Sequence, residues 1–128
     1  MSYYFSKTVN MTFDEAIDKV TEELKKEGFG ILTEIDVKAA LKKKINVDFR
    51  KYRILGACNP SFAHKALLAE DKIGLMLPCN VIVQEGENGT VEVAAIDPVA
   101  SMQSVKNENL GEIAAIVQLK IKQVIENM

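Results

Sequence analysis

Apolar residues recur at every second position in five short stretches of the chain, which is the spacing of strands that bury one face. In the stretch 29–35, for example, Phe29, Ile31 and Ile35 would share a face. The stretches alternate between apolar and polar residues rather than being apolar throughout. This favours a largely antiparallel sheet with helices on one face and a more solvent-exposed opposite face. The expected strands are residues 2–9, 29–35, 51–58, 79–85 and 90–97.

Helical periodicity fills the segments between these strands. From Phe13 to Leu24, apolar residues repeat three or four positions apart, which predicts one buried stripe. Thr12 and Glu15 form a capping box before this stripe. Gly28 after the stripe can adopt the left-handed backbone conformation that ends a helix. Further helices are expected over residues 37–45, from 60 to about 71, and from about 109 to the end of the chain.

The order of these elements indicates one α+β domain over residues 1–128, with no internal repeat or linker. Apolar residues make up 48% of the chain and charged residues 27%, which is typical of a soluble globular domain and excludes a disordered chain, a collagen-like chain and a coiled coil. No apolar run approaches the roughly 18 residues of a membrane-spanning helix. The N-terminal residues lack the layout of a secretory signal, so we expect a cytoplasmic protein with no membrane partner.

Charge is concentrated in one segment. Residues 38–53 contain seven basic residues and one acidic residue, a net charge of +6, whereas the other residues contain nine basic and seventeen acidic residues, a net charge of −8. Lys42, Lys43 and Lys44 are therefore candidates for binding an anion or nucleic acid. Only Phe49 and Tyr52 lie nearby to stack on bases, which disfavours nucleic acid and favours an ordinary solvated surface.

Topology brings several polar and sulfur-bearing residues together. The turn at residues 86–89 makes a tight hairpin of the last two strands, so Asp97 at the end of one lies near Cys79 at the start of the other. If the third and fourth strands are antiparallel, Cys58 joins them; if they are parallel, Cys58 lies at the opposite edge of the sheet. In the antiparallel arrangement the residues at this rim are Cys58, Asn59, Cys79, Asn80 and Asp97.

The two cysteines allow two interpretations. Cys58 precedes a helix capped by Asn59, where the positive end of the helix dipole favours a thiolate, and a second thiol nearby would permit a reversible disulfide. Cysteine is also among the most buried residue types, and Cys79 shares a strand face with Val81 and Val83, as a core residue would. Two cysteines and one histidine are too few for a four-ligand zinc site, so no metal is expected.

The outer side of the last helix carries a small candidate contact surface. Ile116 and Leu119 lie off its inner apolar stripe, with Gln123 next to them. Large apolar side chains on an outer face indicate self-association, although scattered surface apolar residues are common.

Three short motifs resemble a known family. Residues 54–60 (Ile-Leu-Gly-Ala-Cys-Asn-Pro), residues 77–81 (Leu-Pro-Cys-Asn-Val) and the pair Asp97-Pro98 are similar to those of the bacterial and archaeal family called domain of unknown function 302. The resemblance implies a curved antiparallel sheet of about five strands backed by two main helices, in the TATA-binding-protein-like fold class, with one or two short extra helices. It also implies a homodimer and favours the antiparallel choice for the third and fourth strands. It implies no activity.

No motif of the sequence indicates a catalytic centre. There is no Gly-rich phosphate loop after a strand and no Gly-x-Ser-x-Gly turn. The leading hypothesis is a non-catalytic dimeric domain that binds a small ligand or a partner around Cys58 and Cys79, and no cofactor is indicated. The alternatives are a thiol-dependent redox protein that uses the same two cysteines, and a protein that binds anions through the basic segment.

Overall fold

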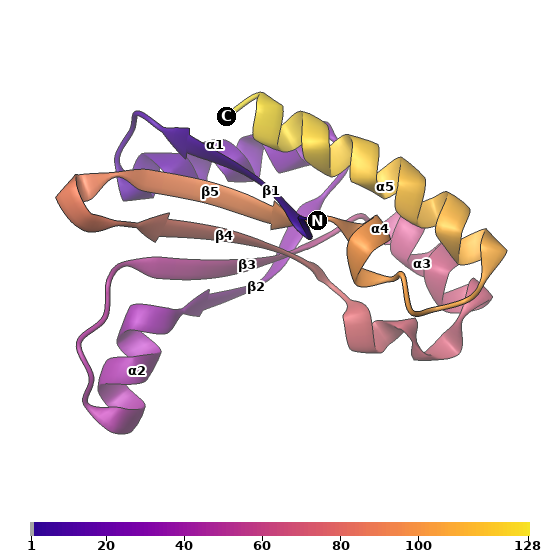
Figure 1. Cartoon of the computed structure of the whole chain (residues 1–128), viewed down its shortest axis with the longest axis horizontal. Coiled ribbons are helices and arrows are strands. Elements are labelled where there is room, and N and C mark those ends of the chain that lie inside the picture. The colour runs from indigo at the N-terminus through magenta and orange to yellow at the C-terminus, as the bar shows by residue number, and fades with distance from the viewer. Residues whose placement is uncertain (1) are drawn as a thin grey trace.

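An antiparallel sheet organises the computed structural model, which describes residues 2–128 (Figure 1). Its five strands lie in the order β1-β5-β4-β3-β2, and every neighbouring pair is antiparallel. The strands are β1 (Tyr4–Val9), β2 (Gly30–Asp36), β3 (Tyr52–Cys58), β4 (Cys79–Glu85) and β5 (Val91–Ile96). The helices are α1 (Phe13–Lys26), α2 (Val37–Ile45), α3 (Pro60–Ala69), α4 (Pro98–Ser101) and α5 (Glu108–Glu126), with 3-10 turns η1 (Asp71–Met76) and η2 (Glu87–Gly89). The predicted α+β fold is confirmed.

Local capping interactions account for the bounds of α1. Thr12 Oγ1 accepts from the Glu15 backbone N–H at 3.1 Å, and Glu15 Oε1 accepts from the Thr12 N–H at 2.9 Å. These hydrogen bonds to Thr12 lower the pKa of Glu15. Gly28, with φ of +86°, adopts the left-handed conformation that follows the helix. Both predicted signals therefore operate in the folded chain.

The main core lies between one face of the sheet and the pair α1 and α5. Val20 and Leu24 of α1 and Ile121 of α5 pack against strand residues such as Val81 and Val93, and each of these five side chains is almost fully buried. A smaller apolar cluster lies where α3, η1, α4 and α5 meet, and it comprises Ala66, Ile73, Met102, Leu110 and Ala114. The two clusters place α3 against the end of the sheet from which β4 starts (Figure 1).

A β-bulge changes which side chains of β2 face the core. The register against β3 shifts between Ile31 and Thr33. Ile31 pairs with Ala57, but Ile35 pairs with Ile54 on the opposite face and is 50% exposed. The expectation that Phe29, Ile31 and Ile35 share one face is therefore wrong for Ile35, because one extra residue in a strand reverses the facing of all that follow.

Gly56 leaves space that β2 and the chain before β4 occupy. A Cβ at this position would overlap Thr33 Oγ1 and lie 2.8 Å from Pro78 Cγ, whereas a Cβ on Gly30 would meet nothing within 4 Å. We expect Gly56→Ala to lower the free energy of unfolding by about 1–3 kcal/mol, as overpacking does, measured by urea denaturation. Gly30→Ala is the matched control, and equal losses for the two variants would contradict this account of the sheet.

Candidate functional site

The pairing of β3 with β4 brings the two cysteines to one rim of the sheet. Ala57 at the end of β3 lies opposite Cys79 at the start of β4, and Cys58 is the next residue of β3. The antiparallel alternative for these strands is therefore correct, as the family resemblance implied. Both thiols are free, Cys79 buried and Cys58 partly exposed.

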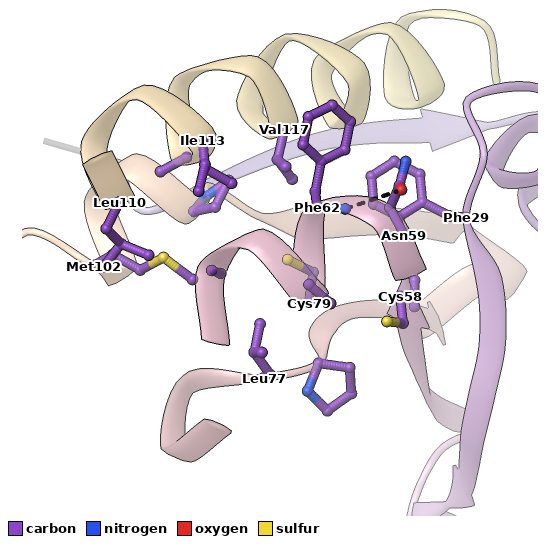
Figure 2. A pocket seen from close by; sticks show the side chains of 16 residues that line it. Phe29, Cys58, Asn59, Phe62, Leu77, Cys79, Met102, Leu110, Ile113 and Val117 are labelled. Atoms are coloured by element: carbon purple, nitrogen blue, oxygen red, sulfur yellow. Dashed lines mark hydrogen bonds between the residues drawn. The ribbon is translucent and has the colours of Figure 1, made fainter. Parts of the chain in front are cut away.

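A cavity of about 40 Å³ lies at this rim, beneath α3 (Figure 2). Cys58 and Asn59 lie toward one end of it, and Met102 and Leu110 lie at the other. Asn59 is the only polar side chain besides the two cysteines among the sixteen residues that line it. The volume is comparable to that of a single water molecule in the liquid and well below the roughly 300 Å³ of a typical drug-sized ligand pocket.

Asn59 already uses its amide in the fold. Its Oδ1 accepts from the Phe62 backbone N–H at 3.5 Å, which caps α3, and its Nδ2 donates to the Glu27 carbonyl oxygen at 3.3 Å, which ties α3 to the end of α1. The cap is the one that Asn followed by Pro predicts. Asn59 therefore positions the cavity wall, and the interior of the cavity is apolar in character.

Burial governs the chemistry of both thiols. Burial raises the pKa of the Cys58 thiol above its ordinary value. Burial, with a smaller contribution from the neighbouring Cys58, raises the pKa of Cys79 to about 11. The pKa of Cys58 is thus raised, whereas the helix N-terminus was expected to lower it, and both thiols are protonated near neutral pH.

Asn80 and Asp97 do not join this cavity. Asn80 follows Cys79 on β4 and points to the other face of the sheet, where its side chain is exposed, because successive strand residues face opposite sides. Asp97 caps α4, where its Oδ1 accepts from the Val99 backbone N–H at 2.9 Å, and its carboxylate also accepts from Gln118 Nε2 at 3.0 and 3.1 Å. The predicted five-residue cluster is thus reduced to Cys58, Asn59 and Cys79.

Sequence reasoning missed the wall that α4 and α5 provide. Met102 follows α4, and Leu110 and Ile113 belong to the first turns of α5. A signal for α4 was present, since Asp97-Pro98 repeats the cap-then-proline pattern of Asn59-Pro60. Nothing in the sequence pattern shows that this short helix lies across the cavity.

The basic candidates lie away from the cavity, on α2 (Figure 1). Lys42, Lys43 and Lys44 are exposed in the last turn of α2, where positive charge complements the helix dipole. Lys42 Nζ lies 3.1 Å from Asp48 Oδ1, so part of the local positive charge is compensated. Anion binding by these residues stays a prediction.

The self-association candidates are accessible on α5. Ile116 is 45% exposed, Leu119 is 67% exposed, and Gln123 is exposed next to them. Their role in contacting a second copy stays a prediction.

Residues 2–128 hold neither a cluster of metal-ligating side chains nor a membrane-spanning helix. No group of three or more His, Cys, Asp or Glu side chains in this part of the chain is arranged to hold a metal ion. None of its helices has the length and apolar character needed to cross a bilayer.

Comparison with known proteins gives one family. The family model described as "Domain of unknown function DUF302" matches residues 5–128. The chain belongs to the DUF302 family. It is 30% identical to the protein whose crystal structure is described as an uncharacterized conserved DUF302 protein from Bacillus stearothermophilus, with 98% of each chain covered and a TM-score of 0.90. No curated protein matches the chain significantly.

The raised pKa values of this DUF302 protein predict slow thiol chemistry. Because only the thiolate reacts with iodoacetamide, we expect slow alkylation of both cysteines at pH 7, with rates that rise about tenfold per pH unit into the alkaline range and with Cys79 the slower. Mass spectrometry of the wild type, Cys58→Ser and Cys79→Ser assigns each rate, and unfolded protein gives the reference. Alkylation of Cys58 at pH 6 to 7 faster than in the unfolded chain would contradict this reading.

Proposed function

We propose that this DUF302 chain is a non-catalytic binding domain that takes a small apolar ligand, or the apolar end of a larger one, into the cavity between Cys58, Cys79, α3 and α5. The observation that carries the proposal is the cavity itself. It lies at the junction of the two apolar clusters, and its one amide is already hydrogen-bonded. An apolar cavity favours ligands without buried polar groups, because a polar group there would lose its hydrogen bonds to water.

The lining of the cavity supports binding rather than catalysis. Its residues include no carboxylate and no imidazole, which are the usual proton donors and acceptors of enzymes. Burial also keeps both thiols protonated near neutral pH, so neither is activated as a nucleophile.

The small volume limits what can enter without rearrangement. The cavity opens to solvent on one side, so a ligand that needs more space than these roughly 40 Å³ either extends toward solvent or displaces part of the wall. Met102 is suited to this, since a methionine side chain is unbranched and adapts to irregular shapes. A short unbranched chain that enters end-on past Met102 or Leu77 fits these limits better than a wide ring system.

A series of linear alcohols from ethanol to hexanol tests the proposal. Each methylene that is buried contributes about 0.8 kcal/mol, so affinity should rise about fourfold per carbon until the cavity is full and then level off. Amide chemical shifts in NMR spectra report both the affinity and the place of binding, with the largest changes expected near Phe62, Leu77 and Met102.

A matched pair of variants provides the control. Ala63→Leu fills the cavity from α3 and should make affinity level off at a shorter alcohol, whereas Ala115→Leu adds the same atoms to the exposed side of α5 and should leave the series unchanged. Thermal melts establish that both variants are folded. Binding in the cavity would be contradicted by an affinity that grows with chain length without levelling off. It would also be contradicted by chemical-shift changes that are the same in Ala63→Leu as in the wild type.

A thiol-dependent redox role is the second candidate. Its support is that Cys58 and Cys79 lie at adjoining ends of neighbouring strands and both line the cavity, since a reversible disulfide needs two thiols close together. The raised pKa values oppose it, and the alkylation rates separate the two candidates. Anion binding through Lys42, Lys43 and Lys44 has less support, because Asp48 already pairs with Lys42.

Self-association is the other element of the proposed function. Ile116 and Leu119 are the apolar part of the candidate surface on α5, and two side chains bury far less than the roughly 800 Å² per partner of a specific interface. A dimer therefore needs a larger apolar surface than α5 alone supplies.

A further inference from the structure

The face of the sheet that points away from α1 and α5 carries an apolar row. Ile35, Ile54, Ile82 and Ala94 lie in register across β2, β3, β4 and β5. Their neighbours Leu55 and Val81 point into the main core, so the row occupies the opposite side, here called the open face. The solvated face of an antiparallel sheet is ordinarily polar, and a row of isoleucines across it indicates a surface that another molecule covers.

The open face is also hollowed. A depression of about 390 Å³ has Ile82 and Ala94 in its lining, together with Tyr4 of β1 and Tyr52 of β3. Tyrosine is enriched at protein interfaces, where its ring packs on apolar groups and its hydroxyl reaches water or a partner. The row and the depression therefore form one continuous surface over several strands.

Helix α2 extends this surface beyond the sheet. It projects past the edge strand β2, away from α1 and α5 (Figure 1). None of its nine residues is buried, and Ile45 and the following Val47 are 62% and 42% exposed. Asp36 and Asn46 cap its two ends, and Val37, Ala40 and Leu41 are only half-buried where the helix contacts β2 and β3. A nine-residue helix with so little packing is marginal in water, and its end at Ile45 lacks the cover that the rest of the fold gives to its helices.

Charge favours a second copy of the chain as the partner. Four basic residues of the segment 38–53 lie on α2, namely Lys38, Lys42, Lys43 and Lys44, and the chain outside this segment has a net charge of −8. Part of the negative charge lies on β4, β5 and the turn between them, at Glu85, Glu87 and Glu92. A twofold dimer presents the same surface from both copies, so a chain that carries a basic projecting element and an acidic body can complement itself.

The available area approaches that of a stable dimer. Five strands about 4.8 Å apart and about 20 Å long give roughly 480 Å² of open face. A nine-residue helix about 13 Å long and about 10 Å wide adds roughly 130 Å². These are flat projections, and the accessible area of the side chains is larger, which brings the total toward the roughly 800 Å² per partner of a specific interface.

We propose that two copies of the chain associate through their open faces, with α2 of each copy lying against the acidic body of the other. This inference rests on the self-association in the proposed function and names its surface. It does not depend on a ligand in the Cys58–Cys79 cavity, which lies on the side of the sheet that the helices cover. Ile35, Ile54 and Ile82 supply the apolar contact, and Lys42, Lys43 and Lys44 supply the charge.

Sedimentation velocity over a range of protein concentrations tests the proposal with three lysine variants. Ile82→Lys and Ile35→Lys both lie on the open face, and each should raise the dimer dissociation constant at least about tenfold, because a buried lysine is desolvated at the interface. Leu119→Lys places the same charge on α5 and should leave the constant within about twofold. Ile35 is 50% exposed and Leu119 is 67% exposed, so neither change disturbs the core, and Ile35→Lys remains informative if Ile82→Lys lowers stability.

The outcomes separate the surface from the self-association itself. A wild type that is a dimer, weakened by Ile82→Lys and Ile35→Lys and weakened further as salt rises from about 0.05 M to about 0.5 M, supports the proposal. A dimer broken by Leu119→Lys and unaffected by Ile35→Lys overturns the open face as the interface and assigns association to α5. A wild type that is monomeric at every concentration overturns self-association altogether.

Discussion

The antiparallel pairing of β3 with β4 is the constraint on which the candidate site depends. Because Ala57 lies opposite Cys79, the chain leaves β3 and re-enters β4 at the same rim of the sheet. The segment between them, α3 and η1, must therefore start and end at that rim. Ala66 of α3 and Ile73 of η1 belong to the same apolar cluster as Leu110 of α5. A parallel pairing would have separated the two thiols by the length of the sheet.

The same packing decides what kind of chemistry the rim can perform. Closing α3 over Cys79 creates the cavity and also removes water from the thiols, which raises the pKa of both. Apolar space and thiol reactivity are thus opposed at this site, because a wall that closed less tightly over Cys79 would solvate its thiol and reduce the apolar volume. In this DUF302 chain the balance favours an apolar cavity with protonated thiols.

Much of the fold follows from local sequence signals, namely capping motifs and the alternation of apolar residues. The capping box at Thr12 and the Asn59-Pro60 pair act where they were expected, and the alternation of apolar residues identifies all five strands. The bulge after Ile31 could not be read from that alternation, because Phe29, Ile31 and Ile35 stay in phase across the polar Thr33 and only pairing with β3 reveals the shift.

The position of the candidate site could be predicted from the sequence, but some of the residues predicted to form it do not belong to it. Hairpin topology placed Asp97 near Cys79, and the antiparallel alternative that the family resemblance favoured added Cys58. These arguments located backbone positions and not side-chain directions, so Asn80 was included although it faces the other side of the sheet. Burial was the other missing quantity. The pKa of Cys58 depends on how tightly α3 and the chain before β4 close around it, which is a property of tertiary packing.

Xenon pressurisation of a crystal of the protein tests the central claim most directly, since xenon enters apolar cavities without needing a polar partner. The account predicts a single strong xenon peak beneath α3, between Cys79, Phe62 and Met102. Xenon peaks elsewhere in the molecule with none beneath α3 would contradict it, because the space at the rim would then be closed to apolar ligands.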